Sequence, residues 1–461
     1  MQPTSLRQIA EWCGGRLVQG SPSTGVAVVS TDTRALVCGE LFVALKGDNF
    51  DAHDFIDVAA DAGVAAIMVS SLNLATERFE GGIIHVKDTL IALQELALHY
   101  RRSRSDLFVV GVTGSNGKTS TKDFLSAVLS KGSVVNATRG NLNNHIGLPL
   151  TILGTDGEHS VGVWEMGMNH PGEIEVLAEI AGPNAAVITN VGTAHIEHMK
   201  TRDAIAEEKG MLAEAVGEDG FVVLNANDPY TESIRARCRA RRVITAGIEA
   251  GDVRASDIQP TAKGISFTLS AANDEVRVHL PVSGEHMVAN AVLAAATALE
   301  RGISLTEIAE ALGSVLLSGG RLQRSQIGGV EFLDDTYNAN PDSMRAALNT
   351  LASLEGSGKR IAVLGRMAEL GELEESEHRA LGMAVADAGI DVLIGVGAVA
   401  RLLAEGADGR VKTIRSAADH QDAAAQLQEI AGAGDLVLVK GSRSSAMENV
   451  MKAFADLGEG N

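Results

Sequence analysis

A glycine-rich turn that ends in Lys118 and Thr119 is the segment of this sequence whose residue types point most clearly to a chemical function. It follows the apolar, β-branched run of residues 109–113 and precedes residues 121–130, whose pattern predicts a helix. In such a turn, glycines let backbone N–H groups converge on an anion, the helix N-terminus adds a favourable dipole, and lysine supplies a mobile positive charge. A threonine hydroxyl beside that lysine can hold magnesium. The stretch is therefore predicted to bind the phosphates of a nucleotide.

The turn departs from the usual spacing of phosphate-binding loops. That spacing places a glycine six residues before the lysine, where this chain has Val112, and the nearest glycines are Gly111 and Gly114. An ordinary turn with a solvated lysine is the alternative. The order of strand, glycines, Lys-Thr and helix is the order that phosphate binding needs, and it favours a variant phosphate-binding loop.

Polar side chains also follow other apolar runs, at the strand ends where parallel sheets bind their ligands. The run 161–164 leads to Glu165, which is either a magnesium ligand or a capped structural carboxylate. A later run leads to His195 and His198, each either a metal ligand or a loop histidine with ordinary partners. Lys209 belongs to a predicted helix, where a solvated face is the simpler interpretation.

The first part of the chain alternates short strands with helices. Strands are expected at residues 26–29, 41–45 and 65–69, and a helix at residues 55–62. The loops 30–34 and 46–49 either line a ligand crevice or are ordinary solvated loops. Beyond the phosphate-binding loop, residues 140–149 form a polar turn rich in amides, which suits a neutral sugar or an amide ligand.

Strands alternate with helices again in the last third of the chain. They are expected at residues 330–333, 361–364, 392–396 and 436–439, as in a doubly wound parallel sheet. Asn340 and Pro341 are suited to cap and start the helix after the first of these strands. The glycine fingerprint of dinucleotide-binding sheets is absent, which argues against a dinucleotide ligand.

These patterns indicate an α/β protein with three domains. The expected ranges are 1–87 for a small N-terminal domain, 88–320 for a central domain with the phosphate-binding-loop sheet, and 321–461 for a Rossmann-like C-terminal domain. The length of 461 residues agrees with this division at a prior of ~150 residues per domain.

The composition excludes several classes of protein. A formal charge of -20 and only 3% aromatic residues argue against nucleic-acid binding. No stretch resembles a membrane span and the N-terminus does not resemble a secretory signal, so we expect a cytoplasmic protein that is not embedded in a membrane. Cys13, Cys38 and Cys238 are too few and too widely spaced for a disulfide framework or a zinc site.

Seven segments spread over the whole chain resemble the Mur ligases of peptidoglycan synthesis. They read GELFVALKGDNFDAHDF, VGVTGSNGKTSTKDF, GNLNNHIGLPLT, EMGMNHPGEI, NVGTAHIEH, DDTYNANPDSM and LGRMAELGE. The DNPR motif of the family's member for diamino acids is absent. The resemblance implies a monomer that joins D-Ala-D-Ala to UDP-N-acetylmuramoyl-tripeptide through an acyl phosphate, with ATP and Mg2+ as cofactors. The N-terminal domain would bind the UDP group.

The resemblance also implies roles for individual residues. ATP contacts would come from Thr113, Gly114, Ser115, Asn116, Gly117, Lys118, Thr119, Ser120, Asn290, Arg321 and Asp335. Magnesium ligands would be Thr119, Glu165, His195 and Lys209, the last as a carbamate, because a carbamate replaces a repelling ammonium with a negative charge. Lys118, Lys209 and His195 would be the catalytic residues.

Substrate contacts are implied in all three domains. The UDP group would meet Ser30, Thr31, Arg34, Lys46 and Gly47, the sugar and diphosphate Asn141, Asn143 and Asn144, and D-Ala-D-Ala Asn338, Asn340 and Ser442. One departure is Arg366, which stands where the family usually has aspartate. Because the ATP contacts come from two domains, we expect the domains to close during catalysis.

Two alternative functions remain compatible with the sequence. The first keeps the reaction but changes the amine, as in another Mur ligase or a folate polyglutamate synthase. The second is a nucleotide-dependent switch or motor that acts on a protein partner. Dependence of phosphate release on small substrates or on a macromolecule separates them.

Overall fold

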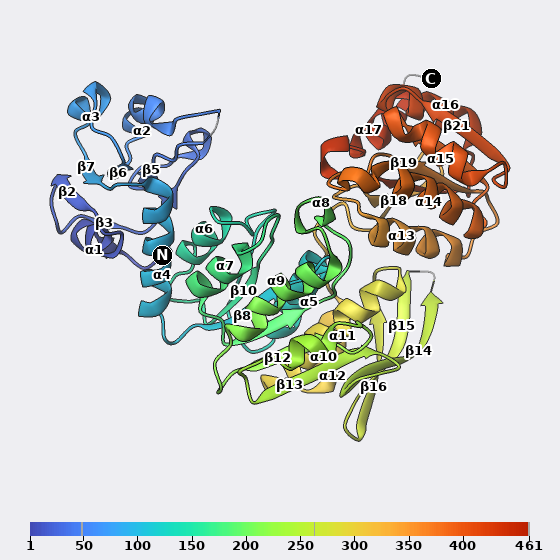
Figure 1. Ribbon diagram of the computed structural model, residues 1–461, viewed down its shortest axis with the longest axis horizontal. Coiled ribbons are helices and arrows are strands. Elements are labelled where there is room, and N and C mark those ends of the chain that lie inside the picture. Colours follow the sequence, from blue (N-terminus) through green and yellow to red (C-terminus); the bar gives the residue numbers. More distant parts are fainter. Residues whose placement is uncertain (48, 262, 460–461) are drawn as a thin grey trace.

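The computed structural model describes residues 1–47, 49–261 and 263–459. Asp48, in one of the loops considered above, lies outside this range. Across the described residues the strands form three large sheets of five, nine and six strands, with a small two-stranded pair beside the first. The sheets follow one another along the chain and occupy separate parts of the molecule (Figure 1). The predicted fold class, three α/β units, is confirmed.

The N-terminal sheet has the order β2-β7-β6-β5-β4. Its strands are β2 (Arg16–Gln19), β4 (Val29–Ser30), β5 (Leu41–Val43), β6 (Ala66–Val69) and β7 (Gly82–His85), accompanied by helices α1 (Leu6–Trp12), α2 (Ile56–Asp61) and α3 (Leu74–Arg78). Strands β4 and β5 are parallel neighbours. The loops that follow them therefore leave from the same edge of the sheet.

The single strand predicted at residues 26–29 is wrong. The chain changes partner within it, so that β3 (Gly25–Val26) pairs with β1 (Thr4–Ser5), whereas β4 pairs with β5. Val26 is buried, but Val28, between the two strands, is 48% exposed. An apolar run alone does not show where such a change of partner occurs.

The middle sheet has the order β16-β15-β14-β13-β12-β11-β8-β10-β9, and its strands run parallel from β14 to β9. The strands are β8 (Phe108–Thr113), β9 (Val135–Ala137), β10 (Val161–Glu165), β11 (Ala185–Ile188), β12 (Phe221–Asn225) and β13 (Arg242–Ile248). The helices are α5 (Lys118–Leu129), α6 (Gly147–Leu153), α7 (Glu173–Ala181), α8 (Ile196–Met199), α9 (Arg202–Glu214), α10 (Thr231–Arg235), α11 (Glu285–Glu300) and α12 (Leu305–Gly313). Strands β8, β10 and β11 are almost wholly buried, which explains their continuous apolar runs.

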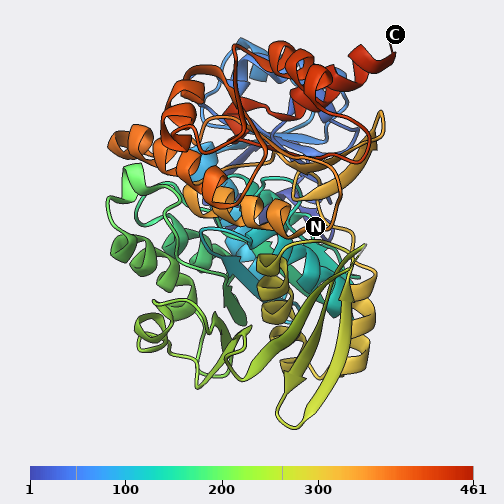
Figure 2. The same cartoon turned by 90° about the vertical axis from the view of Figure 1, so that its right-hand side faces the viewer.

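An antiparallel extension completes this sheet. No strand is predicted for residues 242–280, yet β14 (Val253–Thr261), β15 (Gly264–Ala271) and β16 (Asp274–Leu280) lie there. Strand β14 mixes buried with exposed residues, and polar residues interrupt β15 and β16, so these strands lack the continuous apolar runs of β8, β10 and β11. In Figure 2 these yellow-green strands reach the bottom of the molecule.

The C-terminal sheet has the order β17-β18-β22-β19-β20-β21 and is parallel except for β17. Its strands are β17 (Gln323–Ile327), β18 (Val330–Asp335), β19 (Arg360–Leu364), β20 (Val392–Val396), β21 (Thr413–Ala417) and β22 (Leu436–Lys440). Its helices are α13 (Pro341–Ser353), α14 (Glu374–Asp387), α15 (Ala400–Ala407), α16 (His420–Ile430) and α17 (Glu448–Glu459). Asn340 caps α13, with Ser343 completing a capping box and Pro341 in the first turn, as predicted.

Helix α4 (Thr89–Ser103) joins the first two sheets, because it packs against α1 on one side and against α6 and α7 on the other. The second expected boundary, at residue 320, falls between α12 and β17. The precise domain limits stay a prediction. Within the described residues, every helix is too short or too polar to cross a membrane.

Candidate active site

The predicted phosphate-binding loop connects β8 to α5, and its last glycine is required by the backbone. Gly117 has a φ of +80°, and a Cβ there would lie 2.4 Å from Oδ1 of Asn290 on α11. Lys118 begins α5 and donates from Nζ to the carbonyl of Gly114 at 2.7 Å. The loop thus curls around its own lysine, in the form expected for an anion cradle.

The loop after β11 braces this cradle. Ser115 N–H donates to the carbonyl of Asn190 at 2.9 Å, and Asn116 N–H donates to Oδ1 of the same residue at 2.9 Å. The hydroxyl of Ser115 accepts from Gly192 N–H at 2.8 Å. The conformation of the loop is therefore fixed by a neighbouring parallel strand.

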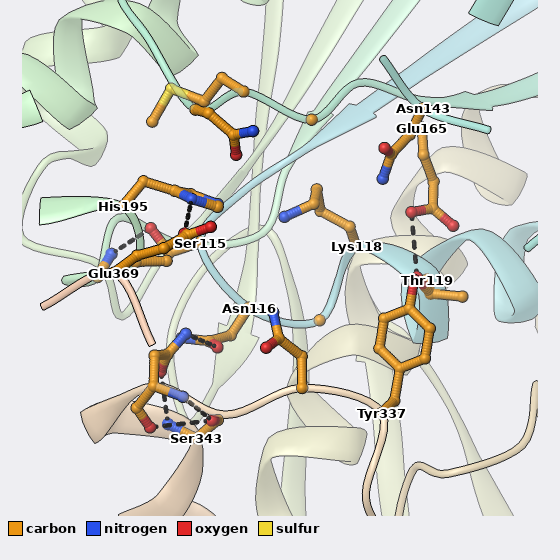
Figure 3. Close-up of a pocket in the computed structure, with 18 of the residues that line it drawn as sticks. Ser115, Asn116, Lys118, Thr119, Asn143, Glu165, His195, Tyr337, Ser343 and Glu369 are labelled. Carbon is orange, nitrogen blue, oxygen red and sulfur yellow. Dashed lines mark hydrogen bonds and ion pairs between the residues drawn. The ribbon is translucent and has the colours of Figure 1, made fainter. Parts of the chain in front are cut away.

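A cavity of about 1260 Å³ extends from this loop to helix α4 on one side and to the C-terminal domain on the other. Figure 3 shows Lys118, Thr119 and Glu165 of the middle domain together with Tyr337 and Ser343 of the C-terminal domain. The predicted site residues that line it are Ser115, Asn116, Gly117, Lys118, Thr119, Ser120, Asn141, Asn143, Asn144, Glu165, His195, Asn290, Arg321, Asp335, Asn338, Asn340 and Ser442. Residues from distant parts of the chain thus meet in one space.

Three predicted residues of the middle domain lie behind the wall of this cavity. Thr113 is fully buried and its hydroxyl donates to the carbonyl of Met166 at 2.9 Å. Gly114 offers its carbonyl to Lys118. Lys209, on α9, is 1% exposed, and burial lowers its pKa well below the ordinary value, with the charge of nearby Lys118 acting in the same direction. The solvated helix face considered for Lys209 is therefore wrong.

The five predicted residues of the N-terminal domain do not line this cavity: Ser30, Thr31, Arg34, Lys46 and Gly47. Arg34 forms a fork with Asp32 at 2.8 and 2.7 Å and holds the pKa of that carboxyl at about 2. Lys46 lies 3.5 Å from Asp51. Arg34 follows β4 and Lys46 follows β5, so the loops that carry them start from the same edge of the sheet. Strand β4 also contacts α6 of the middle domain. A UDP site there stays a prediction.

Two of the three asparagines in the polar turn 140–149 accept hydrogen bonds from backbone N–H groups. Oδ1 of Asn144 accepts from Gly147 N–H at 2.9 Å at the start of α6, and the carbonyl of Asn143 accepts from Gly167 N–H at 2.9 Å. Both residues line the cavity, together with Asn141. The loop is therefore firmly held next to the predicted sugar position.

Glu165 is a buried carboxylate with one oxygen atom that no hydrogen bond from the described residues satisfies. Thr119 Oγ1 donates to its Oε2 at 3.0 Å, whereas its buried Oε1 has no hydrogen-bond partner among the described residues. Glu165 is 1% exposed, and burial raises the pKa of its carboxyl, opposed by the charges of Lys122 and Lys118. A hard cation with oxygen ligands fits this pair of side chains.

The middle and C-terminal domains touch at the edge of the cavity. Asn340 Nδ2 donates to Oδ1 of Asn116 at 2.7 Å, and Oδ2 of Asp342 accepts from the backbone N–H and hydroxyl of Thr193 at 3.0 and 3.2 Å. His195 also reaches across, with Nδ1 2.5 Å from Oε2 of Glu369 (Figure 3). The phosphate-binding loop is thus connected directly to the C-terminal domain.

The far end of the cavity is built by the first loop of the C-terminal domain. The guanidinium of Arg321 stacks over the ring of Tyr337 at 3.9 Å. Lys440 at the end of β22 bonds Oδ2 of Asp335 at 2.6 Å and the carbonyl of Asn338 at 2.9 Å, and it is 3% exposed at its side chain. Lys440 is not among the predicted site residues, and its only signal in the sequence is its place at the end of a buried strand.

Ser442 and Arg366 belong to adjoining loops of this domain. Ser442 N–H donates to the carbonyl of Arg366 at 2.8 Å, and the Ser442 hydroxyl lies 3.1 Å from that of Ser445. The Arg366 side chain turns to Glu374, with two contacts of 2.6 Å that lower the pKa of that carboxyl. Arg366 therefore contributes its backbone to the Ser442 loop and directs its charge away.

Comparisons with known proteins agree with this geometry. The Mur ligase middle domain matches residues 112–298, and the Mur ligase glutamate ligase domain matches residues 320–443. The chain belongs to the Mur ligase family. Within the family it is 37% identical to the UDP-N-acetylmuramoyl-tripeptide--D-alanyl-D-alanine ligase of Bacillus subtilis, with 97% of each chain covered. It is also 37% identical to the ligase of the same name from Escherichia coli, over 99% of this chain and 100% of the relative.

Solved structures show the same likeness over the full length. A crystal structure of MurF from Acinetobacter baumannii has a TM-score of 0.91 at 33% identity, with 99% of each chain covered. A structure of the MurF ligase from Thermotoga maritima in complex with ADP has a TM-score of 0.83 at 30% identity, covering 94% of this chain and 98% of that one. The arrangement of three α/β domains is therefore that of known members of the family.

Replacing Lys440 by methionine tests how the cavity's far end is held. Lys440→Met removes the cation from the carboxylate of Asp335, which is 14% exposed at its side chain, so we expect the free energy of unfolding to fall by about 2 kcal/mol. Calorimetry should also show weaker ADP binding, because Asp335 and Asn338 lose their common anchor. The exposed Lys452→Met is the matched control. Wild-type stability and ADP affinity in Lys440→Met would show that Lys440 does not hold this loop.

Proposed function

We propose that this protein is an ATP-dependent ligase that joins D-Ala-D-Ala to UDP-N-acetylmuramoyl-tripeptide, a step of peptidoglycan synthesis. The observation that carries the proposal is the single cavity that unites the phosphate-binding loop, Glu165 and residues of the C-terminal domain. Relatives named for this reaction align with nearly the whole chain. A cytoplasmic monomer suits an enzyme whose substrates are water-soluble nucleotides and peptides.

ATP is bound between two domains in this proposal. Backbone N–H groups of residues 117–119 and the ammonium of Lys118 cradle the β- and γ-phosphates, while Arg321 approaches the phosphates and Asp335 the ribose. Burial lowers the pKa of Lys118, so phosphate oxygens would restore the environment that its charged form prefers. The ADP named for the Thermotoga maritima structure supports this choice of nucleotide.

Magnesium is the second proposed cofactor, and the residues present fit it. The unpartnered Oε1 of Glu165 and the hydroxyl of Thr119 are hard oxygen donors. Within the described residues there is no group of three or more His, Cys, Asp or Glu side chains that could hold a metal by itself. The remaining ligands would come from phosphate oxygens, as is usual for magnesium, and from His195 and carbamylated Lys209. When bound, magnesium would neutralise charge that develops on the phosphates.

The chemistry follows from this arrangement. A carboxylate oxygen of the tripeptide attacks the γ-phosphorus, the bond to the β-phosphate oxygen breaks, and ADP leaves. The amine of D-Ala-D-Ala then attacks the carbonyl carbon of the acyl phosphate, and phosphate leaves with the former carboxylate oxygen. Lys118 stabilises the charge that is transferred, and the contacts between Asn340 and Asn116 help to enclose the site and exclude water.

Each substrate has a proposed place. The UDP group would lie at the edge formed by Ser30, Thr31, Arg34, Lys46 and Gly47, with the sugar near Asn141, Asn143 and Asn144 and the dipeptide near Asn338, Asn340 and Ser442. Because the UDP edge and the cavity belong to different domains, closure would align the tripeptide with the γ-phosphate. X-ray scattering should therefore show compaction when an ATP analogue and the UDP-substrate are both added, and unchanged dimensions would contradict closure.

Glu165→Gln tests the magnesium site. The amide keeps the size of the side chain and an acceptor for Thr119 but removes the negative charge, so we expect half-maximal activity to require at least about 10-fold more magnesium. Glu179, which is exposed on α7 and does not line the cavity, provides the control variant Glu179→Gln. An unchanged magnesium requirement in Glu165→Gln would exclude Glu165 as a ligand.

The substrate assignment is tested by phosphate release in the presence of UDP-N-acetylmuramoyl-tripeptide and one amine at a time. D-Ala-D-Ala should support turnover, whereas L-Ala, D-Glu and diamino acids should not. Preference for one of these amines would assign the chain to another reaction of the family. Hydrolysis stimulated by a macromolecule, without either small substrate, would favour a nucleotide-dependent switch.

A further inference from the structure

Two residues with left-handed backbones face each other across the boundary between the middle and C-terminal domains. His195 has a φ of +64° and Glu369 a φ of +60°. Residues with a Cβ adopt such angles rarely, and they keep them where the surroundings fix the backbone. The two side chains meet with Nδ1 of His195 2.5 Å from Oε2 of Glu369. The contact is therefore made from two constrained positions.

The surroundings of Glu369 account for its fixed position. Its carbonyl accepts from Glu197 N–H at 3.3 Å, in the first turn of α8. Gly371, with a φ of +55°, lets the same loop lie against Glu197, because a Cβ there would come within 3.1 Å of the Glu197 Cγ. The loop after β19 is thus seated on α8, and His195 immediately precedes that helix (Figure 1).

We propose that Glu369 is a positioning residue for His195. In this structure the 2.5 Å approach of Nδ1 to Oε2 is an ion-pair contact that is not aligned as a hydrogen bond. A turn of the ring that aligns it would let the carboxylate accept the Nδ1 proton, which leaves Nε2 with the lone pair. Carboxylates act in this way on histidines that bind a metal or a phosphate, by fixing the tautomer and the orientation of the ring. The inference rests on the proposed function, in which His195 contributes to the magnesium and phosphate site.

The pair also connects the histidine to the docking of the C-terminal domain. Glu369 comes from that domain, as do Asn340 and Asp342, which contact Asn116 and Thr193 of the middle domain. His195 therefore acquires its carboxylate only in the docked arrangement. The tautomer with its proton on Nδ1 would therefore be favoured when the two domains assemble the nucleotide site. The same docked arrangement would protect the acyl phosphate from water.

An ordinary surface ion pair is the competing explanation, because Glu369 is 42% exposed at its side chain. The two explanations differ in the tautomer of His195, which nitrogen NMR of histidine-labelled protein reports without turnover or metal. We expect the Nδ1-protonated tautomer in the wild type at a pH where the ring is neutral. Glu369→Ala should shift His195 towards the Nε2-protonated form, whereas Glu372→Ala, an exposed carboxylate on the same loop, should leave it unchanged. A His195→Gln variant assigns the signals.

Kinetics provide the second readout. Glu369→Ala should lower kcat by about 10- to 100-fold, the range found for partners of ligand histidines, with the KM values for ATP and UDP-substrate unchanged. In a His195→Ala background the same substitution should cause no further loss. Identical His195 nitrogen chemical shifts in the wild type and in Glu369→Ala would overturn the proposal. So would a double variant whose reduction in kcat equals the product of the two single reductions. Absence of ligation by the wild type would instead contradict the proposed function, while the NMR result would still stand.

Discussion

Lys118→Ala is expected to reduce kcat for ligation by at least about 100-fold, the scale of losing a preorganised charge at a reacting oxygen. The ammonium of Lys118 is anchored by the carbonyl of Gly114 at the N-terminus of α5, where the backbone of the loop also converges. No side chain takes over this place when it is removed, because the next cation of the helix, Lys122, is paired with Asp123. Initial rates of phosphate release with both substrates measure the effect.

The control for this variant is Lys131→Ala. Lys131 follows the same helix but forms a partly exposed ion pair with Glu310 at 3.1 Å, which contributes little to stability. Circular dichroism and thermal unfolding should be like the wild type for both variants. Retention of most of the activity by Lys118→Ala would mean that the loop is not the phosphate site.

Lys209→Ala is expected to have the second large effect, a loss of turnover of roughly 100-fold or more, on the scale of removing a charged group from the site. Lowering the pKa of a lysine enlarges the fraction of neutral amine at neutral pH, and the neutral amine is the form that adds to carbon dioxide. The product, a carbamate, has a negative charge that the nearby ammonium of Lys118 favours, whereas it repels the charged amine. Burial at 1% exposure then protects the carbamate from solvent.

Chemical rescue separates this role from a structural one. The Lys209→Ala variant leaves a void in which formate or acetate can replace the carbamate, so millimolar carboxylate should restore part of the activity. Glu207→Ala, at an exposed position of the same helix, should neither lose activity nor respond. Full activity in Lys209→Ala without added carboxylate would rule out the carbamate.

Much of the fold was predictable because the parallel strands are buried on both faces. The runs before Glu165 and His195 are continuous and apolar, and the glycines before Lys118 mark the loop between them. Asn340 and Pro341 likewise predict the start of α13, because helix capping depends only on residues that are close in sequence. Features that depend on local sequence were therefore visible.

Features that depend on which strands become neighbours were not predictable. Lys440 meets Asp335 only because β22 lies beside β18, although the two residues are far apart in the chain. Glu369 meets His195 only because two domains dock. The burial of Lys209 depends in the same way on how α9 packs under the phosphate-binding loop, and a helical pattern beside two glutamates gave no indication of it.

The most direct test of the proposed ligase is mass spectrometry of a reaction with UDP-N-acetylmuramoyl-tripeptide whose terminal carboxylate is labelled with oxygen-18. With ATP, magnesium and D-Ala-D-Ala, we predict a product equal in mass to the two substrates less one labelled water, and released phosphate that contains one labelled oxygen. Both products should be absent without D-Ala-D-Ala. Unlabelled phosphate, or release of phosphate without an amide product, would contradict ligation through an acyl phosphate at this site.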